Sequence, residues 1–149
     1  DRPDMALQKF TKSILAGNKI SVFNYGKHRR DFTFIDDIVK GIILVLDQPA
    51  KPNQSWNSAN PDPGSSSAPW RIYNIGNNSP VKLLDYIQAI ESALEIKANK
   101  DLMPLQPGDV IDTYADVNEL VENFNYKPST SINEGVLKFV DWYKEYYKS

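Results

Sequence analysis

The sequence of 149 residues predicts an α/β protein of the α+β kind, in which helices alternate with short strands. Three observations support this fold class. Apolar residues recur at helical spacing over 83–94 and again after Ser131. Apolar and polar residues alternate at 30–35, as they do in half-buried strands, and 71–75 is also strand-like. The chain is also 41% hydrophobic, which suffices for the core of roughly one domain.

The chain is expected to begin with a helix and a strand. Asp4 can cap a helix over about residues 5–16, which Gly17 then ends. Residues 20–23 are typical of a short strand, and the polar residues 24–27 that follow predict a turn.

A second strand and helix are expected next. The alternating stretch 30–35 predicts a half-buried strand. Asp36 or Asp37 is then expected to cap a helix that ends near Asp47, because acidic side chains are favourable at a helix N-terminus.

Residues 48–69 differ from the rest of the chain in composition. They are rich in Pro, Ser, Asn and Gly and contain almost no aliphatic side chains, so they cannot bury enough apolar surface to order themselves well. We predict a flexible surface loop here, not a domain boundary, because the strand-like 71–75 follows at once. Trp56 either packs within this loop or is solvated.

The second half of the chain continues the alternation of helices and short strands. The patterns predict a helix over 83–94, an edge strand over 97–103 and a turn at Pro107–Gly108. A short strand at 113–115 is expected next, followed by a short helix that Asp116 and Glu119 cap and that ends near Phe124. The last helix is expected to begin with the capping box of Ser131 and Glu134.

Composition and charge argue against several classes of protein. The 17 basic and 19 acidic residues nearly balance, which argues against a general binder of nucleic acid or of anionic membranes. Cysteine is absent and histidine occurs once, which argues against thiol chemistry and against a histidine-rich metal centre. No apolar run approaches the roughly 20 residues of a membrane span, so a location inside the cell is the default.

The familiar catalytic motifs are also absent from this sequence. Its seven glycines do not form G-x-G-x-x-G or a phosphate-binding P-loop, and neither Tyr-x-x-x-Lys nor G-x-S-x-G occurs. The residues alone therefore indicate no catalytic set.

Two segments are candidate binding edges. In the first, Arg29-Arg30-Asp31, a guanidinium fork matches phosphate oxygens and Asp31 could hold that fork in place. The alternative is an exposed basic turn whose charges contribute nothing measurable. The second edge is the segment from Gln106 to Asp109, where glycine permits close approach of a ligand and Asp109 could accept from vicinal hydroxyls. The alternative is an ordinary Pro-Gly turn with a solvated acid.

Other residues that could carry chemistry have simpler interpretations. His28, the single histidine, is interpreted as a turn residue. The tyrosines and tryptophan near the C-terminus are interpreted as core packing and not as a ligand platform.

The chain resembles a known family at these same places. The stretches DRPDMA, RRDFTFIDDIV, WRIYNIGNNSPVKLLDYI and LQPGDVIDTYAD are similar, in this order, to the C-terminal half of nucleotide-sugar epimerases of the extended short-chain dehydrogenase/reductase superfamily. The resemblance covers essentially the whole chain and is closest to the UDP-glucuronate 4-epimerases.

The resemblance implies a division of labour between two domains. An N-terminal Rossmann domain, missing from these 149 residues, would hold NAD and a catalytic tyrosine, and the present residues 1–149 would form the small C-terminal domain that grips a UDP-sugar. Transient oxidation at sugar carbon 4 followed by return of the hydride inverts that carbon, so NAD is retained. The fragment alone would then be inactive.

The resemblance also implies which residues contact the nucleotide sugar. Arg30 matches the arginine on the diphosphate, Asp109 the acid near the ribose hydroxyls, and Ser21 and Phe23 the segment that holds the uracil. Arg2 matches a residue at the lip of the sugar pocket. Gln106 stands where many relatives have a phosphate-binding arginine, although glucuronate-type members have glutamine there.

The expected partners follow from the same resemblance. They are the UDP-sugar and the missing Rossmann domain of the same chain, with no nucleic acid, no membrane and no metal. The parent enzyme would be a cytoplasmic homodimer of polysaccharide biosynthesis that associates through the missing domain, so this piece would not form the native dimer. Two alternatives stay open: a nucleotide-sugar dehydratase, decarboxylase or reductase, and a stand-alone binding module without catalysis.

Overall fold

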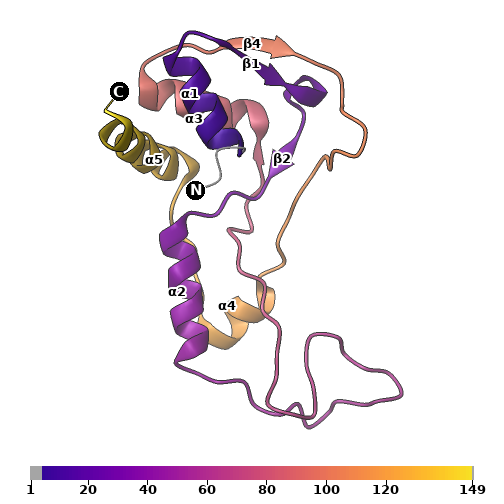
Figure 1. Ribbon diagram of the computed structural model, residues 1–149. Coiled ribbons are helices and arrows are strands. Elements are labelled where there is room, and N and C mark those ends of the chain that lie inside the picture. The colour runs from indigo at the N-terminus through magenta and orange to yellow at the C-terminus, as the bar shows by residue number, and fades with distance from the viewer. Residues whose placement is uncertain (1–4, 149) are drawn as a thin grey trace. The chain divides into compact units, whose positions relative to one another are not determined.

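The computed structural model describes residues 5–148, and the chain divides into two compact units. Each unit is built from segments that lie far apart in the sequence. The first contains the residues up to 32 together with 79–113 and those from 130 onward, and the second contains 33–78 and 114–129. Figure 1 shows the helices and strands of both.

Three helices form the centre of the first unit. They are α1 (Ala6–Leu15), α3 (Leu83–Leu94) and α5 (Ile132–Tyr147), and α3 packs against both of the others. Ile87 of α3 and Val140 of α5 are completely buried, at positions that the amphipathic patterns place on the inner faces. The helices expected over 83–94 and after Ser131 are therefore confirmed.

The core of this unit joins the three helices to one strand. Burying a large aliphatic side chain contributes about 1.5–3 kcal/mol, so these contacts hold the unit together. The buried members are Ile14, Ile20, Val22, Tyr86, Ile87, Ala89, Ile90, Leu94, Val136 and Val140.

The first and last helices, α1 and α5, begin differently. At α5 the Ser131 side chain accepts a hydrogen bond from the Glu134 amide at 3.2 Å, which is one half of the expected capping box, while the Glu134 carboxylate contacts Lys138 Nζ at 2.9 Å. At α1 the residue before the helix is Met5, which provides no side-chain cap. The expected cap, Asp4, lies outside the described residues.

A small parallel sheet flanks these helices. β1 (Lys19–Val22) pairs with β4 (Asn99–Leu102), and Ile20 lies opposite Lys100. The strands expected at 20–23 and 97–103 are thus confirmed with shorter bounds, and Phe23 already belongs to the next element.

The chain turns sharply after β1, in the short helical segment η1 (Phe23–Gly26). Gly26 has φ +76, and a Cβ placed there would lie 2.6 Å from side-chain carbons of Leu84. Glycine is therefore required on two grounds, the left-handed backbone and the close approach of α3.

A second, antiparallel pair fixes the segment that follows. β2 (Arg29–Arg30) pairs with β3 (Val81–Lys82), and on its other side the Arg29 amide donates to the Ile111 carbonyl at 3.0 Å. The strand expected over 30–35 is wrong in extent. Its pairing stops after Arg30 because no neighbouring strand among the described residues accompanies the chain further, and a helix begins at Ile35.

The second unit contains two helices, α2 (Ile35–Leu46) and α4 (Asn118–Phe124). The residue before α2 is Phe34, which provides no side-chain cap. The expected cap by Asp36 or Asp37 is therefore wrong, since both acids lie inside the first turn, where their charge still favours the helix. The Asp37 carboxylate instead accepts a hydrogen bond from the Ser129 amide at 3.1 Å, which ties α2 to the segment after α4.

The start of α4 differs from its expected cap, since the residue before the helix is Val117, which provides no side-chain cap. One residue earlier, the Asp116 carboxylate accepts from the Asn118 amide at 3.0 Å, and Glu119 lies in the first turn. The helix ends at Phe124, as expected. The strand expected at 113–115 does not form, because only Asp112 makes an isolated bridge there, with Arg29.

Residues 47–78 contain no helix, and local side-chain hydrogen bonds order parts of them. The Asp62 carboxylate accepts from the Ser65 hydroxyl and the Gly64 amide, which lowers the pKa of Asp62 against a smaller opposing effect of burial. The Trp56 indole donates to the Asp62 carbonyl at 3.4 Å. The flexibility expected of this loop stays a prediction.

The strand expected at 71–75 does not form. Arg71 makes only an isolated bridge with Ser65, and the amides of Tyr73, Asn74 and Ile75 have no hydrogen-bond acceptor among the described residues. A strand needs a neighbour, and beyond Ile72, whose amide donates to the Gly64 carbonyl at 2.9 Å, the described residues supply none. None of the described helices is both long and apolar enough to cross a membrane.

Candidate functional site

A pocket in the first unit collects most of the residues that the sequence singles out. Its volume is about 390 Å³. Aliphatic and aromatic side chains make up much of its wall, and charged groups stand among them. The lining residues are Met5, Ala6, Phe10, Ser21, Phe23, His28, Arg30, Asp31, Phe32, Leu83, Asp109 and Thr113.

The extended segment through β2 supplies one wall by simple alternation. Successive side chains of an extended chain point to opposite sides, so His28, Arg30 and Phe32 face the same way. All three line the pocket and Arg29 does not, although Asp31 also lines it where the chain leaves β2. This spacing is visible in the sequence and could have identified His28 and Phe32 as site residues, which the sequence analysis missed.

The Arg30 guanidinium is held in place by backbone carbonyls. Its two terminal nitrogens donate to the carbonyls of Arg29 at 2.9 Å, Ile111 at 2.8 Å and Val110 at 2.6 Å. The loop that follows β4 is thereby tied to β2. No carboxylate among the described residues forms an ion pair with Arg30, so its charge is available for an anion.

Asp31 does not hold the Arg30 fork, contrary to the expectation from the sequence. The Asp31 carboxylate accepts from the Ser79 amide at 3.1 Å, and its own amide donates to the Thr113 hydroxyl at 3.4 Å. The Arg30 guanidinium is bonded to backbone carbonyls instead. Asp31 instead joins the pocket wall to the segment that enters β3.

An aromatic pair stiffens the apolar side of the pocket. The ring of Phe32 stacks on that of Tyr86, with centroids 4.0 Å apart and planes 14° from parallel. Tyr86 belongs to α3 and is only 3% exposed, and burial raises the pKa of its phenol, so it stays neutral. Phe32 is thus fixed against the helical core.

The structure brings together four of the six residues expected to contact a ligand. Ser21, Phe23, Arg30 and Asp109 line this one pocket. Gln106 does not line it, although its carbonyl accepts from the Asp109 amide at 3.2 Å and so closes the turn that presents Asp109. Arg2 lies outside the described residues.

The turn itself is formed as the sequence predicts. Gly108 has φ +85, a left-handed conformation that glycine adopts without strain. A Cβ added to Gly108 would meet nothing within 4 Å, so the turn leaves open space beside Asp109. Whether Asp109 and Arg30 contact a ligand stays a prediction.

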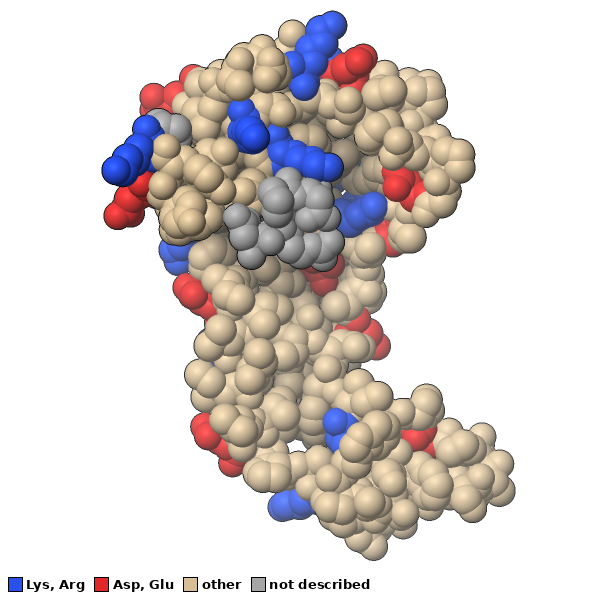
Figure 2. Space-filling view, viewed as in Figure 1, with Lys and Arg blue, Asp and Glu red and all other residues tan. Residues whose placement is uncertain are grey.

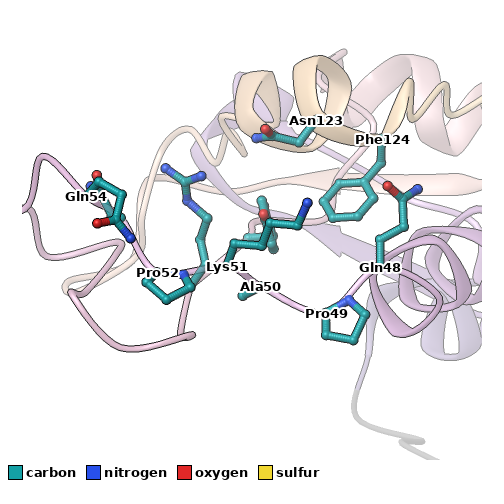
Figure 3. A pocket seen from close by; sticks show the side chains of 11 residues that line it. Gln48, Pro49, Ala50, Lys51, Pro52, Gln54, Asn123 and Phe124 are labelled. Atoms are coloured by element: carbon teal, nitrogen blue, oxygen red, sulfur yellow. The ribbon is translucent and has the colours of Figure 1, made fainter.

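A second hollow, in the second unit, contains none of these six residues. Its volume is about 370 Å³, and Figure 3 shows Lys51, Gln54, Asn123 and Phe124 at its border. Arg71 also lines it and contacts Glu119 at 3.7 Å. Because this hollow contains none of the residues that the sequence singles out, the pocket of the first unit is the better candidate.

Charges and metal-binding groups give no competing site. On the face shown in Figure 2, Lys and Arg side chains are interspersed with Asp and Glu. Across residues 5–148, no cluster of His, Asp and Glu could hold a metal ion.

Comparison with known proteins identifies the class of protein to which this fold and pocket belong. The model of the NAD dependent epimerase/dehydratase family matches residues 1–76. Among curated proteins, Protein CapI of Staphylococcus aureus is 56% identical over 147 residues, covering 99% of this chain and 44% of the relative. UDP-glucuronate 4-epimerase 2 of Arabidopsis thaliana is 43% identical over 151 residues, covering 99% of this chain and 34% of the relative.

A solved structure shows the same fold. The crystal structure of the UDP-glucuronic acid 4-epimerase from Bacillus cereus, in complex with UDP-glucuronic acid and NAD, has a TM-score of 0.76 and 27% identity. The match covers 99% of this chain and 42% of that one. The expected fold class is therefore confirmed, as that of the C-terminal part of such epimerase structures.

The chain belongs to the NAD dependent epimerase/dehydratase family. It spans less than half the length of the relatives just named.

Proposed function

We propose that these 149 residues are the nucleotide-sugar-binding part of an NAD-dependent UDP-sugar 4-epimerase that acts on UDP-glucuronate and UDP-galacturonate. The observation that carries the proposal is the pocket in which an arginine without an ion-pair partner among the described residues, a carboxylate and an aromatic wall meet. The printed names and ligands of the relatives support the choice of sugar and nucleotide. The cytoplasmic setting and the role in polysaccharide synthesis belong to the same proposal.

Each part of the pocket suits one part of the ligand. The Arg30 fork would neutralise a diphosphate, because a guanidinium forms charge-assisted hydrogen bonds with phosphate oxygens. Asp109, presented by the turn that Gly108 forms, would accept from the ribose hydroxyls. Ser21 and Phe23, two residues apart around the end of β1, would hold the uracil.

NAD is assigned to a part of the longer protein outside these residues. The sequence contains no glycine-rich turn of the kind that cradles a dinucleotide, so the present residues do not fit this cofactor. NAD supplies the hydride chemistry at sugar carbon 4, and the present residues would anchor the nucleotide while the sugar turns. On this proposal the 149 residues alone are inactive, and dimers form through the other domain.

The second unit supports the presence of such a partner domain. Helix α2 has two apolar faces: Gly41 packs on Ile75 and Tyr126, and a second stripe of apolar side chains is exposed, while Asp36 and Lys40 provide its exposed polar groups. A continuous exposed apolar stripe is typical of a surface that packs against another element. We infer that this stripe docks on the rest of the longer chain. It consists of Ile35, Val39, Ile42, Ile43 and Leu46.

Titration of UDP tests the proposal at Arg30. In the full-length protein, Arg30→Ala should weaken UDP binding by about 1.5–3 kcal/mol, or roughly 10- to 150-fold, because one charge-assisted contact to phosphate is lost. Isothermal titration calorimetry measures this. Arg29→Ala is the matched control, since Arg29 has the same charge but does not line the pocket, and its affinity should stay within about twofold.

The outcomes separate the alternatives clearly. Equal weakening by the two alanine variants would point to general charge and would remove Arg30 from the site. Full-length protein that fails to bind UDP at all would reject the proposed ligand.

A further inference from the structure

Among the described residues that line the pocket, His28 has a buried polar atom without a partner. The residue is 5% exposed, it lines the pocket, and its Nε2 has no hydrogen bond within the described part of the chain. Buried polar side-chain atoms are nearly always hydrogen-bonded, so each exception requires a reason. A ligand that completes the hydrogen bond is such a reason at a pocket wall.

The backbone fixes where this imidazole lies. The His28 carbonyl accepts from the Leu83 amide at 2.9 Å, and the following residues are paired with β3 on one side and with 111–113 on the other. The backbone pairing therefore holds the Cα of His28 at the wall of the pocket. Rotation of the ring about its last torsion is soft, so either edge of the ring can present a nitrogen to the cavity.

The place of His28 within the pocket distinguishes it from the charged groups. His28 and Arg30 are two residues apart on the same face of an extended chain, about 6–7 Å along it. Apolar side chains from α1 and α3, Phe10 and Leu83, also line the cavity. A flat, uncharged group suits such a wall better than an anion does, while Arg30 suits the phosphates.

We propose that His28 hydrogen-bonds the pyrimidine base of the nucleotide and so contributes to base selection. A neutral imidazole has one donor and one acceptor, and the edge of uracil offers both N–H and C=O groups. A site built to hydrogen-bond such an edge discriminates against ligands that lack it, because the buried group is then left unpaired. This inference rests on the proposed function, since it takes the ligand of the pocket to be a uridine nucleotide.

The test compares UDP with inorganic pyrophosphate, which has no base. In the full-length protein, His28→Leu should weaken UDP binding about tenfold through the lost hydrogen bond, and should leave pyrophosphate binding within about twofold. His28→Gln, which keeps a donor and an acceptor near Nε2, should recover part of the UDP affinity. Calorimetric titration measures the affinities of wild type and both variants.

A spectroscopic measurement on the unmodified protein keeps the proposal testable if a variant folds poorly. With ¹⁵N-histidine labelling, the imidazole signals of His28 are identified as those that His28→Gln lacks. Addition of UDP should shift them, and addition of pyrophosphate should not. The melting temperature of unliganded His28→Leu should equal or exceed that of the wild type, because the variant removes a buried unpaired group.

Each contrary result has a definite meaning. Equal UDP affinity in wild type and His28→Leu, with unshifted imidazole signals, overturns the role of His28 and leaves the proposed function intact. Equal losses for UDP and pyrophosphate in His28→Leu would show that His28 shapes the pocket and does not read the base. Wild type that binds no UDP overturns both the inference and the proposed function.

Discussion

At the scale of single residues, Glu91 is the most heavily used carboxylate among those described in the first unit. Its side chain is 4% exposed and accepts from Lys100 Nζ at 2.5 Å, from the Ala98 amide at 2.8 Å and from Lys97 Nζ at 3.4 Å. Burial by itself would raise the pKa of Glu91, but the hydrogen bonds from Lys100 and Ala98 and the two lysine charges outweigh it and leave the pKa lowered. Glu91 therefore fastens the end of α3 to β4.

Glu91→Gln should lower the free energy of unfolding by about 1–3 kcal/mol at neutral pH, because the charged acceptor is lost. The folded-state pKa of Glu91 lies below the unfolded one of about 4.3, so its contribution is complete above that pH and disappears as the pH falls through the folded value. Urea unfolding of wild type and variant should therefore differ at pH 7 and converge in acid. Glu145→Gln, an exposed control, should stay within about 0.5 kcal/mol.

Four of the expected site residues came from the family resemblance and not from the residue types alone. They are Ser21, Phe23, Arg30 and Asp109, and the structure places all four on one pocket. His28 was assigned to a turn because its burial depends on β3 and α3, which come more than 50 residues later. The role of Glu91 was likewise not predictable, since its partners Ala98 and Lys100 follow a turn after α3 whose geometry the sequence does not give.

At the scale of elements, helices with strong local signals were predicted, and strands that need a distant neighbour were predicted less completely. Helix α3 and the start of α5 follow from spacing and capping alone, and the strands β1 and β4 were expected without their pairing. The segment 71–75 is strand-like but makes only the bridge between Arg71 and Ser65 among the described residues, and within 30–35 only Arg30 is paired. Hydrophobic periodicity thus reports which face is apolar, and pairing requires a second chain segment.

The glycine in the turn at η1, after β1, gives a prediction about stability. Gly26→Ala should destabilise the protein by about 2–4 kcal/mol, since the left-handed backbone costs about 1–2 and the contact with Leu84 adds a similar amount. Gly17→Ala is the matched control, because Gly17 has φ +69 and a Cβ added to it would meet nothing within 4 Å. In a Leu84→Ala background the two glycine substitutions should cost the same in urea unfolding. A persistent difference there would contradict the contact argument.

At the scale of the whole molecule, the second unit is incomplete on the side of its exposed apolar stripe. Leu46 is 74% exposed and Ile35 60%, on a helix whose opposite face is already packed. On the packed face of this helix, Ile75 lies against Gly41, and the amides of Tyr73, Asn74 and Ile75 have no acceptor among the described residues. Both features are explained if the longer chain supplies a sheet and its covering layer.

Hydrogen exchange of the full-length protein tests this explanation. The amides of Tyr73, Asn74 and Ile75, which have no acceptor among the described residues, should exchange slowly because a neighbouring strand pairs with them. The amide of Ser58, in the exposed loop, should exchange rapidly in the same sample. Rapid exchange at all four positions would contradict the docking of the second unit.

The way in which Arg30 is held has a consequence for how a ligand would be received. A guanidinium has five N–H donors, and three hydrogen bonds to carbonyls leave two directions unused. An oxyanion can therefore bind without displacing the three carbonyls, and the Arg30 guanidinium can hydrogen-bond the loop and the ligand at the same time. Occupancy and loop order are then thermodynamically linked, so proteolytic cutting near Val110 should slow when the cavity is filled.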